Sequence, residues 1–201
     1  MADDRVSIGM RITAGELRGR RVVHARRNRV VRPTTARVRE ALFNIVGTLH
    51  GATVLDCFSG SGVMALEALS RGAGSVVSIE EQRQAVRSMQ ALSREWGLTA
   101  RWRIRQMELT CALPQFEGSH FSLIFADPPY RSGWLQRLPQ LLIEHRVTAD
   151  YLVIEESSAE SVAWSAPVIH LSSRRYGEST LHFLQLQQGG IDEDCCLSGD
   201  F

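Results

Sequence analysis

The chain has 201 residues, of which 44% are hydrophobic and 22% charged. This length suits one well-buried α/β domain with a small addition, and it argues against two full domains. No run of about 18 or more apolar residues is present, and the first ten residues lack the apolar core of a signal peptide, so we expect a cytoplasmic protein without a membrane segment. The four cysteines lack the spacing of a zinc site, and we expect no bound metal.

Charge is distributed unevenly along the chain, although the net charge is only +1. Residues 1–39 contain 11 arginines and three acids, which gives +8 there and leaves −7 for the remainder. All 23 basic residues are arginine, whose planar guanidinium group chelates phosphate. The basic end is therefore a candidate surface for an anion such as a nucleic-acid backbone.

Residues 1–31 predict a basic N-terminal β-hairpin arm. Residues 8–13 and 20–24 have the pattern of two short strands joined by a glycine-containing turn. A hairpin of this size is stable only if it docks on something else. After Pro33, apolar residues recur at helical spacing up to Leu49, so one amphipathic helix is expected to lead into the next domain.

Residues 32–188 form the main predicted domain. From residue 53 onward, strands alternate with helices in the pattern of a parallel, doubly wound sheet. Strands are expected at 53–57, 76–80, 102–106, 121–126 and 151–155, and helices at 63–71, 82–96 and 134–145. Residues 168–172 and 180–187 predict a closing antiparallel hairpin, which makes the sheet mixed. Residues 189–201 contain four acids and no base, and they predict a disordered acidic tail.

The first strand of this sheet ends in a glycine loop. Gly60 and Gly62 allow a sharp turn and a close approach of the backbone to a ligand. Glu80, at the end of the next strand, stands where it can accept hydrogen bonds from ribose hydroxyls, so a nucleoside cofactor is indicated. Residues 60–65 also satisfy G-x-G-x-x-A, and a nicotinamide or flavin dinucleotide is an alternative on this motif alone.

Asp56, at the mouth of the glycine loop, favours S-adenosylmethionine over NAD. A carboxylate there repels a pyrophosphate, whereas it can receive the ammonium group of a methionine moiety. Glu108 follows the third strand and is expected near the adenine, although a solvated turn acid is an equal alternative. The predicted cofactor-binding residues are Asp56, Phe58, Ser59, Gly60, Gly62, Glu80, Glu81, Glu108 and Thr34.

The sequence Asp127-Pro128-Pro129-Tyr130 follows the fourth strand of the domain, beside the cofactor loop in a doubly wound sheet. An exocyclic amine of a nucleobase is a poor nucleophile, because its lone pair is delocalised into the ring. The Asp127 carboxylate and the Pro128 carbonyl can accept both N–H groups and favour a more nucleophilic nitrogen. The prolines hold these acceptors rigidly, and Tyr130 offers a face on which a base can stack. These four residues are the predicted catalytic residues.

Over about residues 10–187, the chain resembles the bacterial RsmD-like 16S ribosomal RNA guanine-N2 methyltransferases. The matching segments are 10–15 (MRITAG), 17–20 (LRGR), 32–35 (RPTT), 37–44 (RVREALFN), 55–62 (LDCFSGSG), 66–72 (LEALSRG) and 127–130 (DPPY). The last segment is shared with DNA adenine and protein glutamine methyltransferases, so it indicates the reaction type. The leading hairpin and the Arg-Pro-Thr-Thr helix start are the specific part.

The resemblance implies a Rossmann-like class I methyltransferase fold. It also implies transfer of a methyl group from S-adenosylmethionine to a guanine 2-amino group of small-subunit rRNA, within an assembling ribosomal particle. We expect a monomer. A DNA adenine-N6 methyltransferase is an alternative, but the chain has no long insertion for reading a duplex. The second alternative is a non-catalytic rRNA-binding assembly factor.

The helix after Pro33 is predicted to bring its first residues to the active face, because only a short link separates its end from the first strand of the sheet. Arg32, Thr34 and Arg37 then reach that face, where a helix N-terminus can bind the cofactor carboxylate or an RNA phosphate. For Arg39, a surface position and a functional one are both open. The candidate RNA-binding residues are Arg11, Arg18, Arg20, Arg32 and Arg37.

Overall fold

The central sheet of the protein has both parallel and antiparallel strands. A computed structural model describes residues 8–24, 35–160, 163–164 and 167–187. The strands of the sheet are β3 (Thr53–Asp56), β4 (Ser75–Glu80), β5 (Trp102–Gln106), β6 (His120–Ala126), β7 (Thr148–Ser157), β8 (Val168–Tyr176) and β9 (Ser179–Leu186). Their order is β5-β4-β3-β6-β7-β9-β8; the first five are parallel, and β9 pairs antiparallel with β7 and β8.

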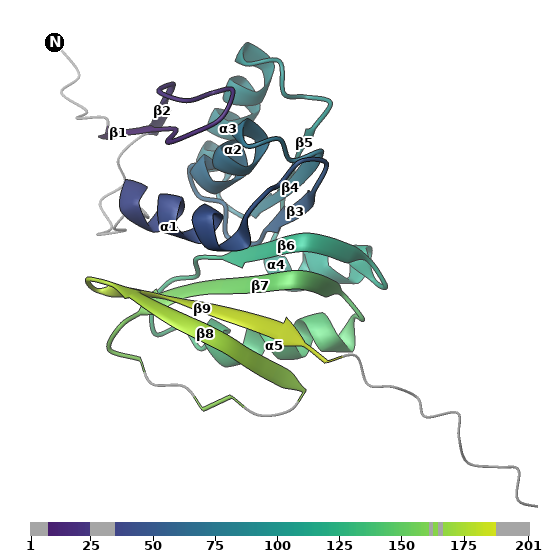
Figure 1. The fold of residues 1–201 in the computed structure, drawn as a ribbon. Coiled ribbons are helices and arrows are strands. Elements are labelled where there is room, and N and C mark those ends of the chain that lie inside the picture. Colours follow the sequence, from purple (N-terminus) through teal and green to yellow (C-terminus); the bar gives the residue numbers. More distant parts are fainter. Residues whose placement is uncertain (1–7, 25–34, 161–162, 165–166, 188–201) are drawn as a thin grey trace, which may run out of the picture.

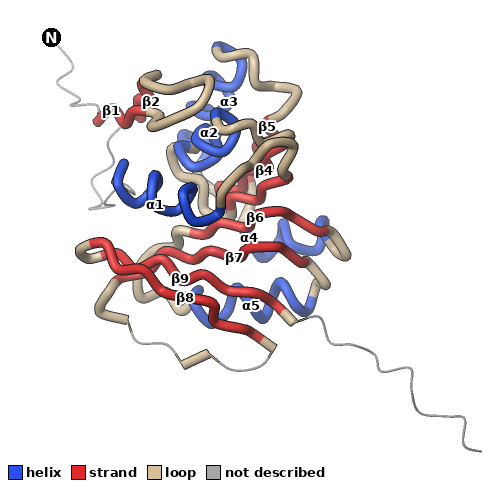
Figure 2. The backbone as a smooth tube through the Cα atoms, viewed as in Figure 1, coloured by secondary structure: helices blue, strands red, loops and turns tan. Residues whose placement is uncertain are grey.

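Helices cover both faces of this sheet, as Figures 1 and 2 show. On one face lie α1 (Ala36–Val46), α2 (Val63–Ser70) and α3 (Arg83–Glu95). On the other lie α4 (Leu109–Ala112), the short 3-10 helix η1 (Leu113–Phe116) and α5 (Trp134–Glu144). Each set of helices packs on its own hydrophobic cluster, so the sheet is buried on both sides. The result is a three-layer α/β architecture.

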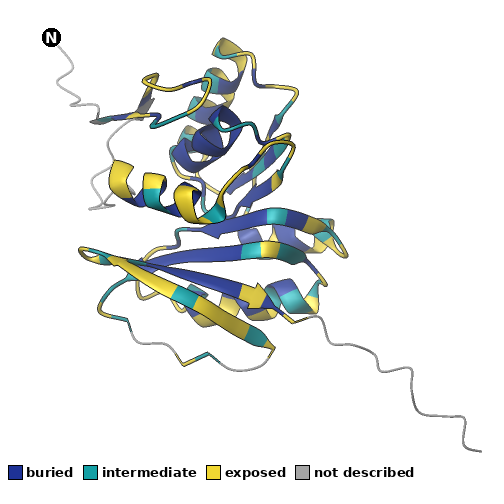
Figure 3. Ribbon diagram, viewed as in Figure 1, coloured by how far each residue is buried: buried dark blue, intermediate teal, exposed yellow. Residues whose placement is uncertain are grey.

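The burial of each helix follows its sequence pattern. All eight residues of α2 are buried, and Figure 3 shows this helix at the centre of its layer. In α1, Val38, Leu42 and Phe43 are buried at helical spacing, while the opposite side of the helix faces solvent. The cap of α1 is Thr35, whose hydroxyl oxygen accepts a hydrogen bond from the Val38 amide at 3.3 Å.

A separate two-stranded hairpin, β1 (Ile8–Arg11) and β2 (Arg21–His24), packs against the helices of the first layer. The contact is built on Glu67 of α2, which is fully buried. Its carboxylate accepts hydrogen bonds from the amide and hydroxyl of Thr13 at 2.9 and 2.8 Å, and from Arg39 Nε at 3.1 Å. Arg39 also donates to the Arg11 carbonyl oxygen at 2.8 Å. The hairpin therefore shares a buried polar network with α1 and α2, which assigns Arg39 a structural position.

The structure confirms the mixed sheet, the N-terminal hairpin and the closing hairpin. It extends two strands beyond their expected bounds: β7 begins at Thr148, and β8 runs through Tyr176, so that only Gly177 and Glu178 form the final turn. The short helices α4 and η1 were not expected. The division at residues 31 and 32 and the tail 189–201 lie outside the described residues, and the domain limits stay predictions. No helix in the described ranges is both long and apolar enough to cross a membrane.

Candidate active site

The candidate site lies where the strand order of the sheet reverses. β3 is flanked by β4 on one side and β6 on the other. Beyond the end of β3, the Cys57 amide donates to the Phe125 carbonyl of β6 at 2.9 Å, and the Ser59 amide donates to the Ile79 carbonyl of β4 at 3.0 Å. The loop is therefore fixed between both neighbouring strands. In doubly wound sheets, this point at the carboxyl ends of the strands is where ligands bind.

The two glycines of the loop have different roles. Gly62 caps α2 with a φ of 75°, and a Cβ atom there would come within 2.8 Å of Met89 Sδ and Trp102 Cζ2. A glycine is therefore required at position 62, because α2 packs too closely against Met89 and Trp102 for any side chain. Gly60 has a φ of 51°, but a Cβ atom there would meet no atom within 4 Å. The side of the loop at Gly60 is therefore open to a ligand.

Asp56 is a buried carboxylate at the base of the loop. Its side chain is only 1% exposed, and neither carboxylate oxygen has a hydrogen-bond partner among the described residues. Burial raises the pKa of Asp56 to about 7, and the charge of Glu80 adds to this shift. The neighbouring Ser59 hydroxyl lowers the pKa of Asp56 and offsets only part of this rise. That hydroxyl donates to the Asp56 backbone oxygen at 3.0 Å. Buried polar atoms are normally paired, so this acceptor fits a ligand that brings a cationic donor.

Glu80 joins the end of β4 to the glycine loop. One of its carboxylate oxygens accepts a hydrogen bond from the Gly60 amide, and the other accepts one from the Gln82 amide, each at 2.8 Å. Carboxylate oxygens can accept more than one hydrogen bond each. The side chain therefore orients the loop and retains acceptor capacity for hydroxyl donors of a ligand.

The other predicted cofactor residues differ in burial and in their distance along the chain from the glycine loop. Phe58 packs edge-on against Trp134, the first residue of α5, with ring centroids 5.1 Å apart, so an aromatic wall stands beside the loop. Glu81 and Glu108 are exposed, each just beyond the end of a neighbouring strand, β4 and β5 respectively. Thr34 lies outside the described residues.

The second half of the site follows β6. The register pairs Asp56 of β3 with Phe125 of β6, so Asp127 is two residues beyond the level of Asp56. Asp127 is half-buried, Pro128 is buried, and Pro129 is exposed. The sheet thus brings the four residues Asp127 to Tyr130 to the same edge as the glycine loop, as the sequence predicts.

Tyr130 is held in place by residues from two later strands. Its hydroxyl lies 2.7 Å from the Ser179 hydroxyl of β9 and 3.5 Å from a carboxylate oxygen of Glu155 of β7. Burial raises the pKa of Tyr130 to about 12, with the charges of Glu155 and Asp127 contributing, so the phenol is neutral at physiological pH. Ser179 and Glu155 were not predicted as site residues, because they are 49 and 25 positions away and carry no local motif.

The predicted RNA-binding arginines fall into two groups. Arg37 lines a cavity next to Ser179, at the catalytic edge, which is the side of the sheet where Asp127 to Tyr130 follow the carboxyl end of β6. Arg11 donates to the Gly19 carbonyl within the hairpin, and the Arg20 guanidinium lies 5.2 Å from the centre of the Trp96 ring at the end of α3, which is the opposite edge of the sheet. Arg18 is exposed in the hairpin turn, and Arg32 lies outside the described residues. The structure brings only Arg37 of the described candidates to the catalytic edge.

The chain is similar to known proteins over most of its length. "Ribosomal RNA small subunit methyltransferase D" of Escherichia coli is 37% identical over 155 residues, which are 76% of this chain and 76% of that protein. The structure of the Escherichia coli protein yhhF, whose assignment as a methyltransferase is itself provisional, aligns with a TM-score of 0.76 at 29% identity, over 90% of this chain and 99% of that one.

A more distant structure shares the fold. The RNA methyltransferase of Salinibacter ruber, solved in complex with S-adenosyl-L-homocysteine, aligns with a TM-score of 0.64 at 17% identity, over 81% of this chain and 98% of that one. The fold is thus the Rossmann-like class I methyltransferase fold expected from the sequence. The family model described as "Conserved hypothetical protein 95" matches residues 10–185. The resemblance stated from the sequence is confirmed, and the chain belongs to this family of RsmD-like proteins.

Proposed function

We propose that the protein transfers a methyl group from S-adenosylmethionine to the exocyclic 2-amino group of a guanine in small-subunit rRNA. It is an S-adenosylmethionine-dependent rRNA methyltransferase, and the guanine 2-amino group is the finer part of the proposal. The observation that carries this proposal is the presence of two acids, Asp56 and Asp127, at the carboxyl ends of two adjacent strands. Asp56 is buried without a hydrogen-bond partner among the described residues, and Asp127 follows the adjacent strand, two residues further along.

The residues around the glycine loop fit this cofactor. The orphaned Asp56 carboxylate suits the ammonium group of the methionine moiety, which supplies the missing donor. Glu80 accepts the ribose hydroxyls, and the open side of Gly60 allows the nucleoside to approach the backbone. Phe58, Ser59, Glu81, Glu108 and Thr34 complete the proposed cofactor site. Bound S-adenosylmethionine supplies an electrophilic methyl group on a sulfonium centre.

The residues after β6 act on the nucleophile. Asp127 and the Pro128 carbonyl accept hydrogen bonds from the two N–H groups of the amine, which leaves the nitrogen lone pair directed at the methyl carbon. The amine nitrogen would form the bond to the methyl carbon, and the sulfur of S-adenosylmethionine would keep the electron pair of the carbon–sulfur bond. The nitrogen then loses one proton, either to Asp127 or to water. Pro128 and Pro129 keep the acceptors in place, and Tyr130 presents its ring to the base.

The choice of rRNA rests on the family and on charge. The Escherichia coli relative is named as a small-subunit rRNA methyltransferase, and Arg37 stands at the catalytic edge of this chain. Methyl transfer to an exocyclic amine needs an unpaired or flipped-out base, because the amine of a paired base is held inside the helix. An assembling ribosomal particle as substrate and a monomeric, cytoplasmic enzyme are part of the same proposal. Methylation of DNA adenine is disfavoured, because the described domain has no added element for reading a duplex.

One experiment separates these functions. The purified protein is incubated with S-adenosylmethionine carrying a labelled methyl group and with small-subunit rRNA or small ribosomal subunits that lack the modification. The RNA is then digested to nucleosides and analysed by mass spectrometry. We expect the label in N2-methylguanosine. Label in N6-methyladenine, after parallel incubation with DNA, would support the alternative enzyme, and saturable RNA binding without labelled nucleoside would support the assembly factor.

A further inference from the structure

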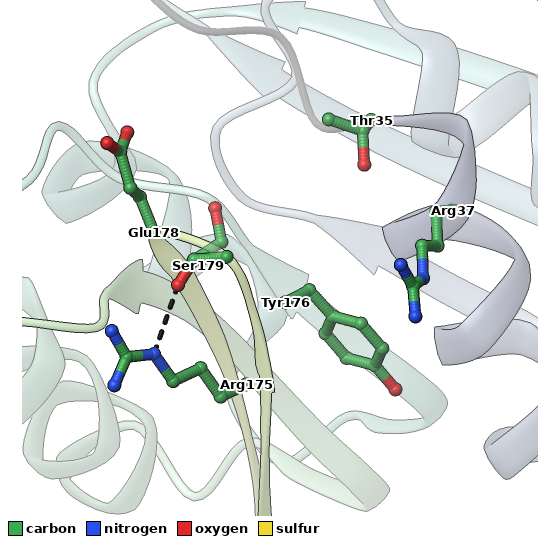
Figure 4. Close-up of a pocket in the computed structure, with 7 residues that line it drawn as sticks. Thr35, Arg37, Arg175, Tyr176, Glu178 and Ser179 are labelled. Atoms are coloured by element: carbon green, nitrogen blue, oxygen red, sulfur yellow. Dashed lines mark hydrogen bonds between the residues drawn. The ribbon is translucent and has the colours of Figure 1, made fainter.

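A cavity of about 310 Å³ opens between the first turn of α1 and the turn that joins β8 to β9. Figure 4 shows its lining residues, which are Thr35, Arg37, Arg175, Tyr176, Gly177, Glu178 and Ser179. Ligand pockets in proteins usually have volumes of about 300 to 1,000 Å³. The cavity is therefore large enough for part of a nucleotide.

The cavity adjoins the catalytic loop directly. Ser179, which lines it, shares a hydrogen bond of 2.7 Å with the Tyr130 hydroxyl. Tyr176 is the cross-strand partner of Ser179, so their side chains are on the same face of the hairpin. Figure 4 shows Arg37 and Tyr176 on that same side. A strand of RNA whose target base lies against Tyr130 thus has its neighbouring nucleotide beside Arg37 and Tyr176.

The charges of the cavity suit phosphate. Arg37 and Arg175 are exposed, and neither forms an ion pair within the described ranges. Arg175 uses its Nε atom to donate to the Gly177 carbonyl at 3.0 Å, which leaves its terminal nitrogens for a ligand. The Glu178 side chain points away from Arg37 and Tyr176 in Figure 4, so its carboxylate does not face that side of the cavity.

We infer that this cavity binds the nucleotide adjacent to the target guanine. Arg175 and Tyr176 are consecutive residues of β8, so their side chains point to opposite faces of the hairpin. The RNA strand crosses the tip of the β8–β9 hairpin, where Arg37 contacts a phosphate on the Tyr176 side and Arg175 contacts a phosphate on the other side. Gly177, at the tip, adds no side chain that would hold the backbone away. The exposed part of the Tyr176 ring offers a surface for the adjacent base. This inference rests on the proposed function and adds a substrate-binding element that is remote in sequence from the basic N-terminal segment.

The test compares Arg37→Ala and Arg175→Ala with Arg103→Ala. Arg103 is an exposed arginine on β5, the strand at the opposite end of the sheet from β8, and it is the matched control. Arg175→Lys is added, because it keeps the charge if the alanine variant loosens the turn. The measurements are the KM and kcat of methyl transfer to unmodified small-subunit rRNA and small ribosomal subunits at several salt concentrations, and the Kd of S-adenosylmethionine.

We expect Arg37→Ala and Arg175→Ala each to raise the KM for RNA by roughly 10-fold and to reduce the salt dependence of binding by about one phosphate contact. The Kd of S-adenosylmethionine should not change, Arg103→Ala should behave like the parent protein, and Arg175→Lys should recover most of the loss. A KM within twofold of the parent in both alanine variants would overturn the inference. So would a parallel rise in the Kd of S-adenosylmethionine for Arg37→Ala, which would place Arg37 in the cofactor site. A parent protein that transfers no methyl group to RNA would instead contradict the proposed function itself.

Discussion

The hydroxyl of Tyr130 lies 2.7 Å from the hydroxyl of Ser179, so the last residue of the predicted catalytic sequence is tied to the closing hairpin of the sheet. Tyr130 stands in a loop whose next residue, Arg131, has a φ of 58°, a conformation that costs a non-glycine residue about 1 kcal/mol or more. The hydrogen bond therefore fixes a side chain on a loop that local backbone preference alone would not hold in this conformation. Methyl transfer should depend on this bond through the orientation of the ring.

Tyr130→Phe and Ser179→Ala test this dependence as a pair. Each change removes the same hydrogen bond and keeps the aromatic ring, so each should lower kcat by about 3- to 10-fold, which corresponds to a hydrogen bond of about 1 kcal/mol. Tyr130→Phe also removes the longer contact with Glu155, so it should be at least as slow as Ser179→Ala. The double variant should be no slower than Tyr130→Phe, because that single change already removes the bond to Ser179. Fully additive losses would show that the two hydroxyls act independently. Thermal unfolding of the three proteins is the control for an intact fold.

Asp56 should make the ligand-free protein less stable as pH rises. Its pKa is raised from 3.8 to about 7 in the folded protein, so between these values the folded chain holds a proton that the unfolded chain has released. The free energy of unfolding therefore falls as pH rises through this window. The decrease in stability reaches its full size above about pH 7. Asp56→Asn should stabilise the ligand-free protein at pH 8 by an amount on the order of 2 to 4 kcal/mol, and by little at pH 4, as measured by urea unfolding.

The same substitution should weaken the cofactor. The ionised carboxylate is the form that pairs with an ammonium group, so the affinity of the parent protein for S-adenosylmethionine should decrease as pH falls below about 7. Asp56→Asn should bind it more weakly at pH 8 and lose this pH dependence. Calorimetric titration at pH 6 and pH 8 measures both effects. Equal affinity of the two proteins at pH 8 would remove Asp56 from the cofactor site.

Glu80→Ala should weaken binding of S-adenosylmethionine by about 10- to 100-fold, because charged hydrogen bonds are worth roughly 1.5 to 3 kcal/mol. The loss has two sources: the ribose acceptor disappears, and the Gly60 amide loses the acceptor that orients the loop. Glu80→Gln keeps one acceptor oxygen and should show a smaller loss. Glu144→Ala, at the exposed end of α5, is the charge-matched control. An unchanged Kd for Glu80→Ala, measured by titration, contradicts the assignment.

Glu67→Ala should destabilise the fold by about 3 to 5 kcal/mol, because it removes the buried carboxylate that accepts from Arg39 Nε at 3.1 Å. The double variant Glu67→Leu with Arg39→Met, which replaces both charges with apolar side chains, should recover only part of this loss, because the Thr13 amide and hydroxyl lose their acceptor as well. Chemical unfolding measures the free energies. If Glu67→Ala unfolds at the same denaturant concentration as the parent, the buried network does not hold the hairpin to α2.

Much of the fold could be predicted because its signals are local. Alternating apolar strands and amphipathic helices marked the sheet, and Gly60 and Gly62 marked the turn after β3. The end of β8 was missed because Arg174 and Arg175 look like loop residues, although their strand is held by pairing with β9. Pairing across the sheet overrode local composition there.

The parts of the site that could not be predicted depend on distant contacts. The sequence placed Asp56 and Asp127 at one edge, because both follow parallel strands. It gave no signal for Ser179, whose contact with Tyr130 exists only once β9 is paired with β7. It grouped Arg11 and Arg20 with the RNA-binding residues on charge, and the structure adds that both guanidinium groups make contacts within the protein. Their part in RNA binding stays a prediction.

The most direct test of the account is single-turnover methyl transfer by Asp127→Ala, with N2-methylguanosine in small-subunit rRNA measured by mass spectrometry. Removing one preorganised acceptor should slow the reaction by about 100-fold or more, while the Kd of S-adenosylmethionine changes little. Asp127→Asn then divides the two possible roles: substantial activity indicates that the carboxylate orients the amine, and activity as low as that of the alanine variant indicates that it also accepts the proton. An Asp127→Ala protein that forms N2-methylguanosine at the parental rate would contradict the account and place the catalytic site elsewhere.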